Sequence, residues 1–94
     1  MEIKFEQSET KGAFYVEENG VRLANMSFSR AGDHTIIIDH TDVSDALRGK
    51  NVGKQLVATA VDYARKNNLK LIPLCPFTKS VIDKVKEYQD VLKK

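Results

Sequence analysis

Two side chains of this sequence have the chemistry for a group-transfer reaction. Cys75 is the only cysteine among 94 residues, and it stands directly before Pro76, where a helix can begin. A thiol near a helix N-terminus ionises more readily, and its thiolate can accept an acyl group and pass it on. His40 follows an apolar run, and its imidazole can accept a proton from an amine or from Cys75. The alternatives are a small buried hydrophobe at Cys75 and a structural histidine.

Three further side chains are weaker candidates for proton transfer. Asp39 and Asp42 flank His40 and are alternative bases, acting directly or through a water molecule. Tyr88, near the C-terminus, can protonate a leaving thiolate, although a tyrosine in a last helix more often packs against the core. No set of cysteines and histidines has the spacing of a zinc site, so no metal is expected.

A basic loop containing two glycines follows the apolar run. It consists of Arg48-Gly49-Lys50-Asn51-Val52-Gly53-Lys54 and leads into an amphipathic segment. Free backbone N–H groups at a helix N-terminus, together with the helix dipole, attract a phosphate or pyrophosphate. The glycine interval is one residue short of a P-loop, and Gln55 occupies the place of its magnesium-binding hydroxyl. An ordinary helix start is the structural alternative.

The first half of the chain predicts an antiparallel meander without helices. Alternation indicates a half-buried edge strand, residues 10–12 are expected to turn, and Asn19-Gly20 is a strong hairpin signal. The predicted strands cover residues 2–8, 13–17, 21–30 and 34–43.

The last strand of this meander carries the candidate base. Its centre, Ile36-Ile37-Ile38, suggests burial on both faces. Strict alternation puts His40 on the same face as Ile36 and Ile38, and Thr41 on the opposite face.

The second half has helical spacing. Apolar residues at positions 52, 56, 57, 60, 61 and 64 form one stripe, and Asn67-Asn68 is expected to end that helix. Residues 69–75 should form a strand parallel to the fourth, because a helix separates the two. Pro73 lacks a ladder donor, so this strand lies at an edge or splays from its neighbour. Pro76 can begin a last helix whose inward residues are Val81, Ile82, Val85 and Tyr88.

Composition indicates a single domain over residues 1–94. Hydrophobic residues make up 41% and charged residues 30%, which is typical of a globular chain. The net charge of +2 is too small to suggest nucleic-acid binding. There is no apolar run of membrane-spanning length and no signal-peptide pattern, so we expect no membrane partner and a cytoplasmic protein, in keeping with the single cysteine.

Three motifs in order resemble the GNAT acetyltransferases. The loop from Arg48 to Gly53 is similar to the acetyl-CoA loop Gln/Arg-x-x-Gly-x-Gly/Ala, with Asn51 where the family usually has Gly. Asn tolerates positive φ better than most residues. The segments His40-Thr41-Asp42-Val43 and Ile72-Pro73-Leu74-Cys75-Pro76-Phe77 resemble those of the minimal, Yjdj-type branch of predicted acetyltransferases.

The resemblance implies an α+β, GNAT-like fold: an antiparallel meander, a strand-loop-helix-strand unit and a C-terminal helix. This chain lacks the two helices that most GNAT proteins have between their first and second strands. The resemblance also implies acetyl-CoA binding in a gap between the fourth and fifth strands. The pantetheine arm would meet main-chain groups of Thr41, Asp42 and Val43. The pyrophosphate would meet Arg48, Gly49, Lys50, Asn51, Val52, Gly53 and Lys54.

Two kinds of function follow from this resemblance. The first is acetyl transfer from acetyl-CoA to an amine, directly or through Cys75, with an acceptor that the sequence does not name. The second is a CoA or acetyl-CoA sensor, or a partner-binding module, without catalysis, since a small chain has few residues for an acceptor pocket. A monomer or weak homodimer is expected, and a second subunit can complete an acceptor pocket.

Overall fold

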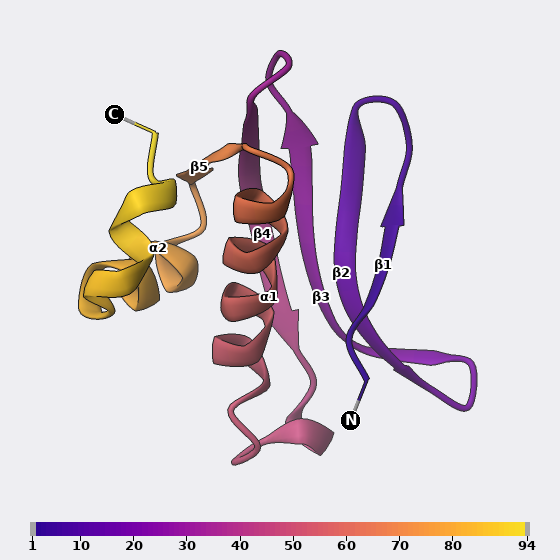
Figure 1. Ribbon diagram of the computed structural model, residues 1–94. Coiled ribbons are helices and arrows are strands. Elements are labelled where there is room, and N and C mark those ends of the chain that lie inside the picture. Colours follow the sequence, from indigo (N-terminus) through magenta and orange to yellow (C-terminus); the bar gives the residue numbers. More distant parts are fainter. Residues whose placement is uncertain (1, 94) are drawn as a thin grey trace.

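The computed structural model describes residues 2–93 as a twisted sheet with helices packed on one of its faces (Figure 1). The elements in chain order are β1 Lys4–Gln7, β2 Lys11–Glu18, β3 Val21–Arg30, β4 Thr35–Val43, the 3-10 helix η1 Asp45–Leu47, α1 Val52–Lys66, β5 Lys70–Pro73, α2 Pro76–Lys84 and the 3-10 helix η2 Lys86–Val91.

The strands lie in the sheet in chain order, from β1 to β5. β1 to β4 pair antiparallel, whereas β5 runs parallel to β4. The α1 helix makes the crossover between these two parallel strands. The predicted α+β class, the meander and the parallel fifth strand are therefore confirmed. Within residues 2–93, no helix has the length and apolarity that crossing a membrane requires.

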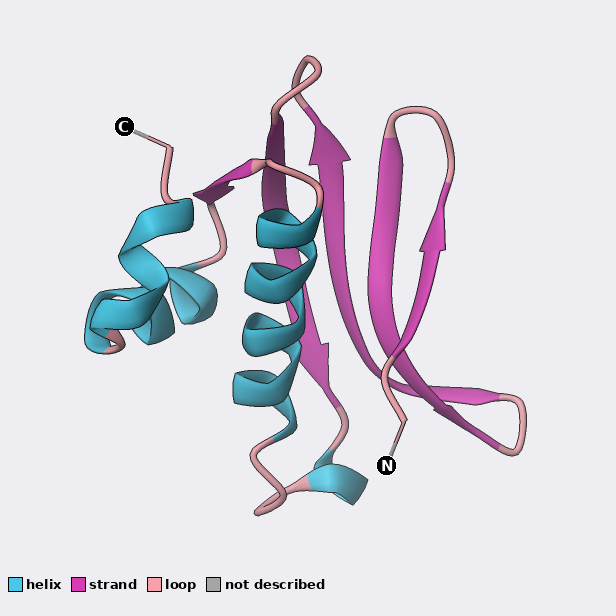
Figure 2. Ribbon diagram, viewed as in Figure 1, coloured by secondary structure: helices cyan, strands magenta, loops and turns pink. Residues whose placement is uncertain are grey.

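The core lies between α1 and the sheet (Figure 2). On β3, burial alternates, because every second side chain faces the helix. The apolar stripe of α1 is also confirmed, and each of its members is at most 2% exposed: Val52, Leu56, Val57, Ala60, Val61 and Ala64. Each fully buried valine or leucine of this stripe contributes roughly 1.5–3 kcal/mol relative to exposure. Burial of the stripe therefore holds α1 against the sheet.

The predicted turn at residues 10–12 is wrong, because Gly12 lies inside β2. It pairs with Gln7 on β1 and with Phe28 on β3. A Cβ atom on Gly12 would lie 2.3 Å from Cζ of Phe28 and 2.8 Å from the backbone oxygen of Glu6. Glycine is therefore present here to make room for a buried ring, and not to turn the chain.

The predicted alternation along β4 is wrong beyond Ile38. Ile38 pairs with Phe28, but His40 pairs with Ser27, so Asp39 is an extra residue in a β-bulge. The bulge reverses the faces. Thr41, opposite the fully buried Met26, faces the helices, whereas His40 lies on the other face.

Burial on both faces of β4 is also incomplete. Ile36 and Ile38 are fully buried against the helices, whereas Ile37 on the other face is only half buried. One face of the sheet around β4 is therefore open.

The fifth strand is shorter than predicted. Its pairing with β4 ends at Pro73, opposite Ile38. The backbone N–H groups of Leu74 and Cys75 then both donate to the Ile38 carbonyl oxygen, at 3.1 and 3.3 Å. β4 continues to Val43 without β5 beside it, so the two strands separate after Ile38.

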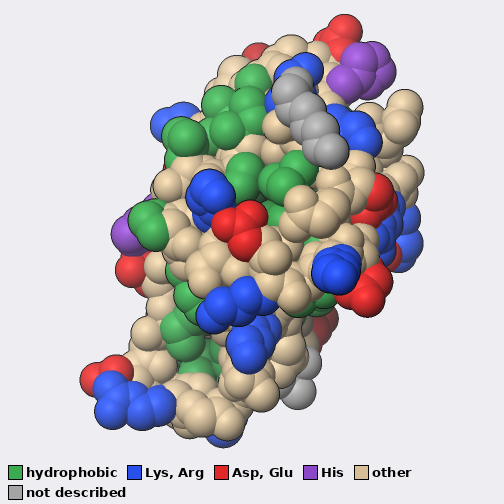
Figure 3. All heavy atoms as spheres, turned by 90° about the vertical axis from the view of Figure 1, so that its left-hand side faces the viewer, with side chains coloured by type: hydrophobic (Ala, Val, Ile, Leu, Met, Phe, Trp, Pro, Cys, Tyr) green, Lys and Arg blue, Asp and Glu red, His purple; other side chains and the backbone are tan. Residues whose placement is uncertain are grey.

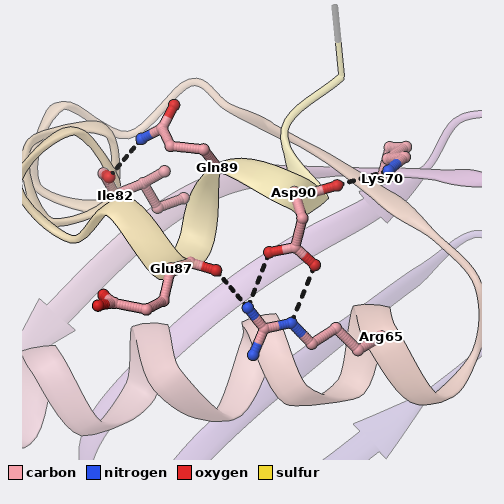
Figure 4. A network of polar contacts seen from close by, with 6 residues as sticks. All are labelled: Arg65, Lys70, Ile82, Glu87, Gln89 and Asp90. Atoms are coloured by element: carbon pink, nitrogen blue, oxygen red, sulfur yellow. Dashed lines mark hydrogen bonds and ion pairs between the residues drawn. The ribbon is translucent and has the colours of Figure 1, made fainter.

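The last helix begins at Pro76 as predicted, and Val81 and Ile82 are buried. It ends at Lys84, however, so Tyr88 lies in η2 and not in the same helix. Figure 4 shows how η2 is attached: the Arg65 guanidinium on α1 donates to Asp90 at 2.7 and 3.1 Å and also to the Glu87 carbonyl oxygen. These contacts hold η2 against α1, directly after the end of α2.

We predict that Gly12→Ala destabilises the protein by about 1–3 kcal/mol, because the new methyl group overpacks the buried Phe28 ring. Urea unfolding of both proteins measures the difference. The double variant with Phe28→Leu is the control: removing the ring should make the effect of the methyl group smaller. If the effects of the two substitutions simply add, the proposed contact is not the cause.

Candidate active site

The N-terminus of α1 presents unpaired backbone donors. Asn51 is its N-cap with φ of 56°, and Gly49 has φ of 83°. Asn51, which stands where the family usually has Gly, therefore keeps the left-handed backbone conformation. The Asn51 side chain does not cap the helix, and within residues 2–93 the N–H groups of Val52, Gly53 and Lys54 have no acceptor. This arrangement suits an anion.

Three cations surround these donors. Arg48 is largely exposed and pairs with Asp45 at 2.9 Å. Lys50 and Lys54 form no ion pair within the described part of the chain. The face of the molecule drawn in Figure 3 carries lysine and arginine side chains beside exposed hydrophobic side chains in its lower part. The charges of Lys50 and Lys54 are therefore available to a bound anion, whereas Arg48 is shared with Asp45.

A cleft of about 450 Å³ connects the loop to β4. Thr41 and Val43 line one side of it, the loop lines another, and Phe77 of α2 closes it. Sequence reasoning missed Phe77. A Cβ atom on Gly53 would lie 2.6 Å from Cζ of that ring, so a glycine in the first turn of a helix was the available signal.

The gap between β4 and β5 exposes main-chain groups of β4. Ser44 donates its N–H to the Leu23 carbonyl oxygen on β3. Asp42, which alternates with Thr41 and Val43, also directs its backbone groups toward β3. Thr41 and Val43 direct theirs the other way, into the gap. Two of the three residues predicted to meet a pantetheine arm therefore have main-chain groups available for it.

Cys75 lies where this gap begins. It is the N-cap of α2 and is 6% exposed. Burial raises the pKa of the Cys75 thiol, but the Thr78 backbone N–H, the Thr41 and Thr78 hydroxyls and the Phe77 N–H act against it, and the net pKa is lowered. The two threonine oxygens are 3.4 Å apart and Thr78 is fully buried. The surroundings of Cys75 therefore favour a thiolate.

His40 does not join Cys75. Its side chain is 67% exposed, and its Nε2 lies 3.0 Å from a carboxylate oxygen of Asp42. Both side chains belong to the face away from the helices. The structure thus brings together Thr41, Val43, the loop and Cys75, and leaves His40 on the opposite face.

Tyr88 is further from this gap. It lines a second, smaller cleft of about 260 Å³ together with Lys54, Phe77 and Lys84. Phe77 and Lys54 border both clefts. Tyr88 therefore borders a neighbouring cleft and does not line the one that contains Thr41 and the loop.

A family model described as GCN5-related N-acetyl-transferase matches residues 13–91. The chain belongs to the GCN5-related N-acetyltransferase family. Among curated relatives, Protein NATD1 of Xenopus tropicalis is 31% identical over 74 residues, which cover 78% of this chain and 68% of the relative. Protein NATD1 of Homo sapiens is 30% identical over 74 residues, which cover 78% and 66%.

Solved structures of two N-acetyltransferase-like proteins share this fold. An NMR structure of a GCN5-like N-acetyltransferase candidate from Staphylococcus aureus is 43% identical, with a TM-score of 0.72, covering 98% of this chain and 87% of that one. The aminoglycoside N-acetyltransferase AAC(6′)-Iy in complex with CoA is 14% identical, with a TM-score of 0.58, covering 82% and 67%. The protein is an acyltransferase with the GNAT fold.

We predict that a small alkylating reagent reacts with the Cys75 thiol at lower pH than with an ordinary thiol. The midpoint is the pH at which the alkylation rate is half of its maximum. Thr41→Val removes a hydroxyl that stabilises the thiolate, so the midpoint should move to higher pH. The rate of alkylation is measured as a function of pH, and the intact mass of the protein reports how much has reacted. Thr59→Val is the matched control, because its hydroxyl bonds to Gln55 within α1. An unchanged midpoint in the Thr41 variant would contradict the assignment.

Proposed function

We propose that this acyltransferase moves an acetyl group from acetyl-CoA to a primary amine. The observation that carries the proposal is the cleft that joins the open donors of the α1 N-terminus to Thr41 and Val43 on β4, where the Thr41 hydroxyl contacts the Cys75 thiol. A diphosphate fits the donors and the surrounding cations, and an extended amide-containing arm fits the unpaired main chain of β4. The thioester would then lie near Cys75.

The residues proposed to hold acetyl-CoA divide into two groups. The main-chain groups of Thr41 and Val43, with Asp42 between them, contact the pantetheine arm. The pyrophosphate is held by backbone N–H groups and mobile cations of the loop: Arg48, Gly49, Lys50, Asn51, Val52, Gly53 and Lys54. The thioester supplies an activated acetyl group, and the protein supplies its position.

In direct transfer, the amine approaches from the open face of the sheet. It loses a proton to His40, whose ring is held by Asp42. The amine nitrogen then attacks the acetyl carbonyl carbon, the C–S bond breaks, and the released sulfur takes up a proton. In this route His40 serves the amine alone, because Cys75 lies on the other face of the sheet.

In the covalent variant, the Cys75 thiolate attacks the acetyl carbonyl first and CoA leaves as a thiol after gaining a proton. The amine then attacks the new thioester on Cys75, and the thiolate is restored. The hydrogen-bond donors around the sulfur support this variant, because they stabilise the thiolate both before and after the transfer.

We predict that Asn51→Val weakens CoA binding about tenfold. A β-branched residue at positive φ costs roughly 1–3 kcal/mol, which would distort the loop. Asn51→Gly should retain the affinity. Isothermal titration calorimetry with CoA measures both. Asn68→Val is the matched control, since Asn68 also has φ of 56° but lies at the other end of α1. Normal CoA binding by a folded Asn51→Val protein would count against the loop as the pyrophosphate site.

We predict that incubation with acetyl-CoA adds one acetyl group to the wild type and none to Cys75→Ala, as measured by intact mass. CoA affinity should remain similar in both proteins. A variant that still acetylates amines would support direct transfer over the covalent variant. Tight CoA binding without turnover on any amine would instead favour the non-catalytic sensor.

A further inference from the structure

The face of the sheet away from the helices has a hollow of about 680 Å³. Helices α1 and α2 pack against the face that carries Phe14, Met26 and Ile38. The hollow lies over β1 to β4 on the other side. It is separate from the cleft that holds the loop and Phe77, because the two share no lining residue.

The hollow exists because two small residues lie side by side. Ala13 on β2 pairs with Ser27 on β3. Glu6 pairs with Ala13 on one side, and His40 pairs with Ser27 on the other, next to the bulged Asp39. Short side chains in the middle of the row and longer ones at its ends make a depression in this open face of the sheet.

Four charged side chains line the hollow, and two of them neutralise each other. The Arg22 guanidinium donates to the Glu6 carboxylate at 2.6 Å. Asp39 accepts a hydrogen bond from the Ser29 hydroxyl at 2.7 Å, and Lys11 pairs in register with the same serine. Neither Asp39 nor Lys11 forms an ion pair within residues 2–93.

The hollow therefore presents one free carboxylate and one free ammonium, on either side of Ser29. Their backbones are separated by two strand spacings, about 10 Å, and both residues line the hollow. This pattern is complementary to a small zwitterion, with its ammonium toward Asp39 and its carboxylate toward Lys11. A dication would meet Lys11 unfavourably.

The hollow also adjoins the reaction gap. Asp39 directly follows Ile38, whose carbonyl oxygen receives the last hydrogen bonds from the β5 side. Because Asp39 lies on β4, the hollow reaches the strand that borders the gap between β4 and β5, with the Asp39 carboxylate turned toward Ser29 of β3. His40, the next residue, lies on the same open face.

We propose that this hollow is the acceptor subsite and that it takes a primary amine bearing a carboxylate, such as an amino acid. Asp39 positions the ammonium group and Lys11 selects for the acid. The proposal rests on the proposed acetyl transfer for its chemical meaning, but the binding of the amine can be measured without turnover.

The experiment is a two-dimensional NMR titration of the ¹⁵N-labelled full chain, with and without saturating CoA. The probes are L-alanine, ethylamine, which lacks the carboxylate, and 1,4-diaminobutane. L-Alanine should shift the amides of Ala13, Ser27 and Asp39 at the lowest concentration, at least threefold below ethylamine. A dispersed spectrum of each variant shows that it is folded.

Asp39→Asn should weaken the binding of L-alanine at least fivefold, and Asp33→Asn, a matched loss of charge in the turn before β4, should not. Lys11→Gln should remove the preference of L-alanine over ethylamine. Shifts outside the hollow, tighter binding of 1,4-diaminobutane, or an unaffected Asp39 variant would overturn the proposal. Failure of CoA to bind would count against the proposed function alone, since the amine shifts are read separately.

Discussion

The end of pairing between β4 and β5 is the constraint on which the site depends. Pro73 has no N–H group, and the Ile38 carbonyl oxygen accepts the N–H groups of both Leu74 and Cys75. Beyond this point the chain turns into α2 and leaves the rest of β4 without a partner on that side. One short interruption of the sheet thus exposes main-chain groups, places Cys75 at their edge and sets the direction of α2.

The bulge at Asp39 acts with this interruption. Without it, His40 would face the helices and Thr41 would face the open side. With the extra residue, Thr41 lies beside Thr78 and Cys75, and the polar pair of His40 and Asp42 lies on the opposite face. The two sides of β4 therefore differ in chemistry. The side that faces the helices meets a thiol and its hydrogen-bond donors, and the open side carries carboxylates and an imidazole.

The remaining elements hold these pieces in place. The stripe of α1 buries itself against the sheet, while Arg65 near its end binds Asp90 of η2, and the pKa of the Asp90 carboxyl is lowered by that guanidinium. Lys93 donates its N–H to the Leu71 carbonyl oxygen beyond η2. These contacts tie the C-terminal segment that follows α2 to both α1 and β5.

Local patterns in the sequence determined much of the protein. The α1 stripe, the β3 alternation, the Asn19-Gly20 hairpin, the helix start at Pro76 and the left-handed Asn51 depend on neighbours within a few residues, where periodicity and backbone preference decide the outcome. The face of His40, the strand position of Gly12 and the contact of Phe77 with Gly53 depend on other strands and helices. A bulge adds one residue without any local signal in the chain, and a ring excludes a Cβ atom only where two distant segments meet. These features are determined by long-range packing and strand register, which only the tertiary structure contains.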